Sequence, residues 1–198
     1  MPSLFACATV FFHAHRDDLI ARYHEHADPA DGYLTQVGET YVMVDAPAAE
    51  IADWARQVRL GLEMSGEGVI ALTVVLLGQY WALALSHDEQ PGPAAVCIPN
   101  EPDMNTQLPR QLFEIERTLV EWLPFDADAD EIDTIFGAML EEALPVEEAF
   151  SELLAMLGCP PEWIRWSWYE TIPQQLFIDP DLASRVTPLG AAKAFWEE

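Results

Sequence analysis

A short run of histidines and aspartates near the N-terminus has the composition of a metal site. His13 and His15 stand two positions apart at the end of an apolar stretch, and Asp17 and Asp18 follow them. Residues i and i+2 of a β-strand point to the same face, so the two histidines could chelate one ion if the strand continues that far. With Asp17 as a further ligand, this segment would hold Zn²⁺ or Mn²⁺ and would suit a small metal-dependent hydrolase.

The same segment resembles the His-x-His-x-Asp-His signature of metallo-β-lactamases. His13, His15 and Asp17 match the signature, whereas Asp18 stands where its last histidine would be. That fold also needs histidine ligands further along, and His87 is the one histidine beyond residue 26. The hydrolase is therefore an alternative hypothesis, and no family is assigned. The simpler interpretation is a strand end that emerges into solvent.

The charge of the chain is the second notable pattern. Its 198 residues include 34 Asp and Glu against 9 Lys and Arg, a formal net charge of −25. Residues 118–164 contain no Lys or Arg, and the helical patterns there place apolar residues on one stripe. The acids must then share the outer faces, where they repel one another and attract a basic protein. The acids expected to bind that partner are Asp130, Asp133, Glu141, Glu142, Glu147 and Glu148.

An aromatic cluster follows the acidic region. Trp163 and Trp166 are followed by Trp168 and Tyr169, with Arg165 between them. Such a cluster either packs in the core or forms an exposed anchor of the kind that dominates interfaces. As an anchor, Trp163 and Trp166 would add to the partner-binding surface.

These patterns favour a non-enzymatic acidic binding protein of the inhibitor, immunity or adaptor type that docks on a basic protein. A DNA mimic is one alternative, and an acidic proteome, in which charge only solvates the fold, is another. Direct nucleic-acid binding is not expected, because phosphates require Lys and Arg. No cofactor is expected unless the histidine segment binds Zn²⁺ or Mn²⁺, and the oligomeric state is left open.

Several classes of protein are excluded by missing residues. The single lysine, Lys193, rules out a P-loop, a kinase or a Schiff-base enzyme, each of which needs a positioned lysine. No Gly-x-Ser-x-Gly or Ser-x-x-Lys motif is present. Cys7, Cys97 and Cys159 are odd in number and far apart, which is typical of reduced thiols in a cytoplasmic, bacterial protein.

Two stretches imitate other features. Residues 126–133 resemble a Ca²⁺ loop, but Glu131 and Gly137 occupy the positions that need Gly and Glu. A helix capped by Asp128 or Asp130 is predicted instead.

Residues 69–86 are almost long enough to cross a membrane, but acids flank them and Gly78 interrupts them. Two buried strands are predicted instead, and no membrane association is expected.

The order of the predicted strands and helices indicates an α+β fold. It has a mostly antiparallel sheet with two helices in the N-terminal half, followed by a helical C-terminal half. The expected division is a sheet domain at 1–99 and an acidic helical region at 100–198, packed as one compact unit. Strands are predicted at 4–13, 33–37, 40–45, 69–77, 79–87 and 94–98, and helices at 16–27, 47–65, 109–122, 128–139, 146–157 and 191–196.

Overall fold

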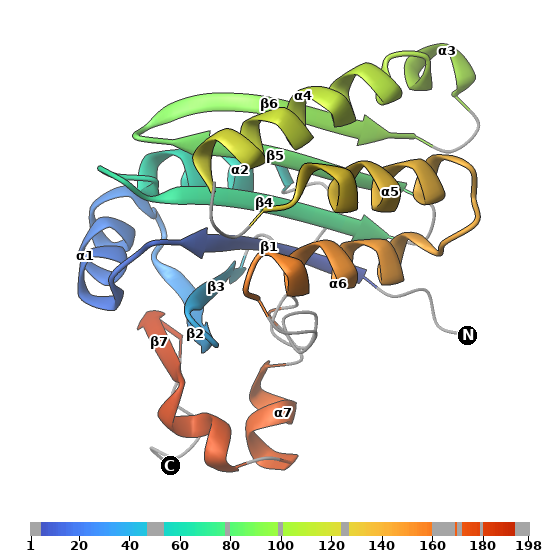
Figure 1. The fold of residues 1–198 in the computed structure, drawn as a ribbon. Coiled ribbons are helices and arrows are strands. Elements are labelled where there is room, and N and C mark those ends of the chain that lie inside the picture. The colour runs from blue at the N-terminus through green and yellow to red at the C-terminus, as the bar shows by residue number, and fades with distance from the viewer. Residues whose placement is uncertain are drawn as a thin grey trace.

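The computed structural model describes residues 5–46, 54–77, 80–98, 101–123, 127–159, 169, 172–178 and 180–192. Seven strands in this part of the chain form one antiparallel sheet, and helices lie on both of its faces (Figure 1). The predicted α+β class is confirmed. The strands are β1 (Phe5–Phe12), β2 (Asp31–Val37), β3 (Thr40–Asp45), β4 (Ile70–Leu77), β5 (Tyr80–His87), β6 (Gln90–Cys97) and β7 (Val186–Gly190), in the order β6-β5-β4-β1-β3-β2-β7.

The helices come mainly in two groups. Helices α1 and α2 each lie between two strands, and the other helices given below follow β6. They are α1 (Arg16–His26), α2 (Trp54–Met64), α3 (Pro102–Asn105), α4 (Leu108–Trp122), α5 (Ala129–Leu140), α6 (Val146–Met156), α7 (Ile172–Ile178) and the 3₁₀ turn η5 (Pro180–Ser184).

The sheet separates two apolar layers, because successive residues of a strand point to opposite faces. On β1, Ala8 and Val10 belong to the larger core, which they share with residues of α4, α5 and α6. Phe11 points to the other face and packs with residues of α1 and α2. In the larger core the rings of Trp81 and Phe150 meet edge to face, with centroids 5.8 Å apart. One core therefore joins strands of the first half to helices of the second.

The apolar stretch 69–86 contributes to β4 and β5, as the sequence predicts. These strands pair antiparallel in the middle of the sheet, and their side chains are almost all buried. Among the described residues, no helix is long and apolar enough to cross a membrane.

The local signals at helix ends are also confirmed. The carboxylate of Asp128 accepts hydrogen bonds from the backbone N–H groups of Asp130 and Glu131, so it caps α5. Beyond α6, Gly158 adopts the left-handed conformation, with a φ of 84°.

The inward face of α2 differs from the prediction. The sequence places Trp54, Val58 and Leu62 of this helix inward and Gln57 outward. In the structure Gln57 is fully buried beside Leu60 and Met64, because its amide donates a 3.0 Å hydrogen bond to Oγ1 of Thr9. The predicted residues 47–53 of this helix lie outside the described part.

Some predicted boundaries are wrong as well. β6 begins at Gln90 rather than at residue 94, because the turn before it is made by Asp88 and Glu89, with φ values of 51° and 57°. The prolines of this strand are tolerated because β6 is an edge strand. The sequence also missed α3, α7 and β7. The predicted helix at 191–196 lies mostly outside the described residues.

Candidate functional site

The histidine segment does not form the strand-borne chelate that its spacing suggested. β1 ends at Phe12, and His13 follows in a left-handed conformation with a φ of 57°. His15 already serves as the N-cap residue of α1, so the two histidines do not share a strand face. Among the described residues, no group of three or more His, Cys, Asp or Glu is arranged to hold a metal ion. The structure therefore does not bring His13, His15 and Asp17 together as a metal site.

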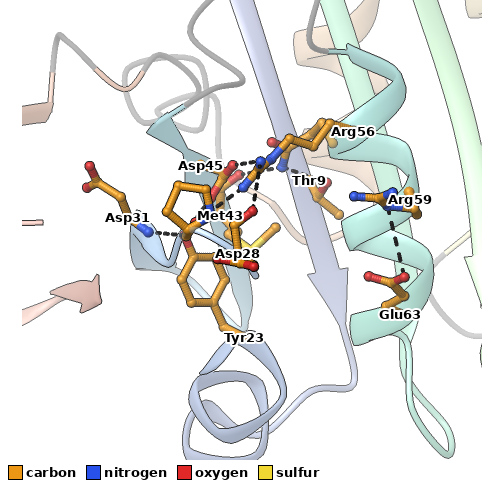
Figure 2. A network of polar contacts seen from close by, with 11 residues as sticks. Thr9, Tyr23, Asp28, Asp31, Met43, Asp45, Arg56, Arg59 and Glu63 are labelled. Carbon is orange, nitrogen blue, oxygen red and sulfur yellow. Dashed lines mark hydrogen bonds and ion pairs between the residues drawn. The ribbon is translucent and has the colours of Figure 1, made fainter. Parts of the chain in front are cut away.

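A buried polar network lies between α1, α2 and the sheet (Figure 2). The Tyr23 hydroxyl donates a 2.5 Å hydrogen bond to Oδ1 of Asp45 and accepts one of 2.9 Å from the backbone N–H of Asp31. Nε of Arg56 lies 3.0 Å from Oδ2 of Asp45. The remaining guanidinium nitrogens of Arg56 donate to the carbonyl oxygens of Asp28 and Pro29. Each carboxylate oxygen of Asp45 thus has a partner.

Burial dominates the electrostatics of this network. It raises the pKa of Asp45, although the hydrogen bond from Tyr23 and the charge of Arg56 act in the opposite direction. Burial also raises the pKa of the Tyr23 phenol, and the neighbouring Asp45 raises it further. The side chains of Tyr23 and Asp45 have no solvent-accessible surface, so a substrate could not reach them. Their arrangement is suited to holding α1 and α2 on the sheet.

A second buried polar group lies where α2 packs on β1 and β4. The Oγ1 atoms of Thr9 and Thr73 are 3.0 Å apart, and the amide of Gln57 donates to the first of them. Gly61 permits this close packing, because a Cβ there would meet Oγ1 of Thr73 at 2.9 Å. Little in the sequence indicated this group, since a glutamine beside Arg56 on a helix is typical of an exposed face.

The predicted aromatic anchor can be examined only in part. Trp163 and Trp166 lie outside the described residues. Tyr169, from the same cluster, contacts the ring of Tyr33 and donates a 2.8 Å hydrogen bond to Oδ1 of Asp31. Burial, followed by this hydrogen bond, raises the pKa of the Tyr169 phenol. Tyr169 therefore packs against the sheet.

A hollow of about 400 Å³ lies beside α1. His15, Asp18, Arg22 and Glu67 contribute polar groups to its wall. Arg22 is already engaged, because its guanidinium forms a 2.7 Å ion pair with Glu89 and donates to the carbonyl oxygen of Glu63. The guanidinium of Arg22 is therefore not left for recognising an anionic ligand in this hollow.

The acids predicted to bind a partner lie on or next to α5 and α6, on the side of the sheet opposite α1 and α2. We call these six acids the acidic helical face. No ion pair joins any of them to a basic residue in the described part of the chain. All are exposed except Glu147, which is half-buried. The acidic helical face consists of Asp130 and Asp133 on α5, Glu141 and Glu142 after it, and Glu147 and Glu148 on α6.

Basic residues are distributed in the opposite way. Four of them, Arg16, Arg22, Arg56 and Arg59, belong to α1 and α2. Each contacts an acceptor, which is Thr187, Glu89, Asp45 and Glu63 respectively. On α4, α5 and α6 the basic residues are Arg110, paired with Glu114, and Arg117. The two sides of the sheet therefore differ in charge as well as in topology.

Three of the six acids have a local structural explanation. Asp130 lies in the first turn of α5, and Glu147 and Glu148 lie in the first turn of α6. Negative charge at a helix N-terminus is stabilising, because it complements the helix dipole. These carboxylates would be reasonable even in a protein without a partner.

Glu141 and Glu142 have no such explanation. They follow the last turn of α5, where the helix dipole disfavours negative charge and which contains no basic residue. Glu142 also has a φ of 56°. Its N–H donates to the carbonyl of Met139, and the N–H of Ala143 donates to the carbonyl of Ala138. This is the Schellman arrangement, in which glycine normally occupies the position of Glu142.

Like charges also meet between α4 and α5. The pKa of Glu116 is raised by burial first, and then by the charges of Asp133 and Asp130. No cation is paired with Glu116 in the described residues. Sequence analysis missed Glu116 because the pairing of α4 with α5 brings it to Asp133.

The whole chain was also compared with known proteins. No protein-family model, curated protein or solved structure matches it.

The candidate site is therefore defined by geometry and charge. It comprises the acidic helical face together with Glu116, on the side of the sheet that has few basic residues. These groups can attract cations, but they form no enclosed arrangement of acid, base and nucleophile among the described residues. Their chemistry is suited to recognising a positively charged surface.

Proposed function

We propose that the protein is a non-enzymatic binding module that docks on a basic protein through its acidic helical face. The observation that carries this proposal is the pair Glu141 and Glu142. Both carboxylates stand where the helix dipole opposes them, and Glu142 adopts a conformation that favours glycine. Residues kept in locally unfavourable positions are often those that function requires.

The distribution of charge supports the same proposal. A basic partner would neutralise the repulsion among Glu116, Asp130 and Asp133, so part of the binding free energy would come from relief of that repulsion. The excess of negative charge on one side would also orient the partner as it approaches and accelerate association at low salt.

The experiment compares two variants with the same change in net charge. The face variant carries Glu141→Gln, Glu142→Gln, Glu147→Gln and Glu148→Gln. The matched control carries Asp18→Asn, Glu25→Gln, Glu39→Gln and Glu67→Gln, all at exposed positions away from α4, α5 and α6. Wild type and both variants are immobilised and exposed to lysate of the native cell at low and high salt.

A protein with a basic isoelectric point should be retained by the wild type and the matched control at low salt. High salt should release it, and the face variant should not retain it. Equal retention by all three proteins would contradict the proposal. Retention of a DNA-binding protein that free duplex DNA displaces would point to DNA mimicry instead.

A further inference from the structure

Two large apolar side chains are exposed in the described part of the chain, and both lie beside the acidic helical face. The exposed fraction is 58% for Phe113, on α4, and 39% for Leu140, at the end of α5. Exposed aromatic residues of this size are frequent anchors at protein interfaces.

Helical geometry places these two residues on facing flanks of α4 and α5. Glu116 lies within range of the charges of Asp133 and Asp130, so its flank of α4 faces α5. Phe113 is three residues earlier and lies on the same flank. Leu140 is seven residues, or two turns, after Asp133, and therefore shares its side of α5. The two helices are consecutive and lie next to each other on the sheet (Figure 1).

Gly137 lies between Asp133 and Leu140 on this flank of α5. A Cβ at Gly137 would meet no atom within 4 Å, so packing inside the chain does not require a glycine there. Glycine within a helix lowers its stability by about 1 kcal/mol relative to alanine. The bare backbone leaves open space on this flank of α5 that a partner side chain can occupy. We call Phe113, Gly137 and Leu140 the apolar patch.

We infer that the apolar patch is the anchor point of the partner surface, and that its occupant is an amphipathic helix with a basic polar face. This inference rests on the proposed function and adds the shape of the partner to it. Two antiparallel helices accept a third helix across them, with its apolar stripe on the exposed apolar residues. The carboxylates of Glu116, Asp133 and Glu141 lie around the patch. Helical spacing also places two cations beside Phe113, Arg117 and Arg110, but Arg110 is already paired with Glu114. Negative charge is therefore in excess there, so the polar face of that helix must be basic.

Charge argues against a second copy of the same chain as the occupant. Each copy has a net charge of −25, and acids outnumber cations around the patch on both copies. Association through this face would therefore bring an excess of like charge together. A basic helix removes the same repulsion that a second copy would increase.

The probe is a fluorescein-labelled peptide of about 18 residues, or five helical turns, with leucines at i, i+3, i+4 and i+7 and lysines elsewhere. A second peptide has the same composition in a scrambled order without an apolar stripe. Binding is measured by fluorescence anisotropy at low and high salt. The chain variants are Phe113→Ala, the conservative Phe113→Trp, and the face variant described above. Since Phe113 is mostly exposed, unfolding in urea should show that Phe113→Ala keeps the fold.

The wild type should bind the amphipathic peptide at least about tenfold more tightly than the scrambled one. Phe113→Ala should lose about this factor for the amphipathic peptide alone, with an unchanged salt dependence, and Phe113→Trp should restore it. The face variant should weaken binding of both peptides.

Three other results would overturn the inference. If Phe113→Ala binds both peptides like the wild type while the face variant loses both, the proposed function stands and the apolar anchor is wrong. If neither variant loses affinity, both proposals fail. A wild-type dimer in sedimentation that Phe113→Ala converts to a monomer would also overturn the inference, since the patch would then be a contact between copies.

Discussion

The phenol of Tyr23 donates a 2.5 Å hydrogen bond to a carboxylate oxygen of Asp45, and neither side chain has solvent-accessible surface. This contact joins α1 to the end of β3, and Arg56 of α2 completes it from the other side. The network fixes both helices on one face of the sheet. The opposite face carries the acids that we propose to bind a partner.

Removing the hydroxyl group of Tyr23 should destabilise the chain without affecting partner binding. Tyr23→Phe leaves a buried oxygen of Asp45 and the N–H of Asp31 without their partner, which should lower the free energy of unfolding by about 1–3 kcal/mol. Urea unfolding at neutral pH measures this loss. An unchanged midpoint and slope would show that the network is not a stabilising contact.

Removing the charge of Arg56 should lower the free energy of unfolding by more than Tyr23→Phe does. Arg56→Met leaves the buried carboxylate of Asp45 without its cation, and such losses cost about 3–5 kcal/mol. Arg59→Met is the control, because Arg59 is largely exposed and its ion pair with Glu63 spans 4.0 Å. Thermal unfolding of the two variants should separate them clearly. Equal loss in both would contradict the importance assigned to Asp45.

The pH dependence of stability follows from the raised pKa values of Asp45 and Glu116. The folded chain holds these two protons more tightly than the unfolded chain does. The free energy of unfolding should therefore fall as pH rises from the ordinary carboxyl pKa of about 4 through the raised folded values. Urea unfolding at about pH 5 and at about pH 7 tests this direction. Glu116→Gln should reduce the difference, and an undiminished difference would show that Glu116 does not contribute.

Two helical glycines should respond to alanine with opposite signs. Gly61→Ala places a Cβ 2.9 Å from Oγ1 of Thr73, and overpacking of this kind costs about 1–3 kcal/mol. Gly137→Ala meets nothing within 4 Å, so it should stabilise the chain by up to about 1 kcal/mol through helix propensity. Calorimetric unfolding of both variants provides the comparison. Destabilisation by Gly137→Ala would mean that this backbone needs its glycine for folding.

Glu142→Gly should increase stability and decrease binding in the same protein. Glycine removes the cost of a left-handed glutamate, about 1–2 kcal/mol, and also removes a charge from the end of α5. The same change deletes one carboxylate of the acidic helical face. Paired measurements of unfolding and partner affinity should therefore move in opposite directions. A variant that is more stable and binds equally well would remove the main support for the proposal.

Local signals predicted much of the fold. The carboxylate of Asp128 and the glycine at 158 mark the helix ends that the structure has, since capping depends on nearby residues alone. Gln57 was assigned to the wrong face because its partner, Thr9, is 48 residues away. β7 was missed because its register depends on β2, more than 150 residues earlier, and because Pro188 weakens its strand pattern.

Sequence patterns also predicted one part of the candidate site and missed another. The lack of basic residues in 118–164 and the apolar stripes of the predicted helices together indicated the acids around Glu141. A helix with one apolar stripe must expose its charges. The left-handed conformation of Glu142 depends on how α5 ends, and the exposure of Phe113 and Leu140 depends on how α4 and α5 pack. Neither relationship is encoded in a local pattern.

The most direct test of the central claim is the salt dependence of affinity for the captured basic partner. Its dissociation constant is measured over a range of salt for the wild type, the face variant and the matched control variant. We predict that the face variant loses at least about tenfold in affinity at low salt and has a shallower dependence on salt, while the matched control stays close to the wild type. The same affinity and the same slope for all three proteins would contradict the claim.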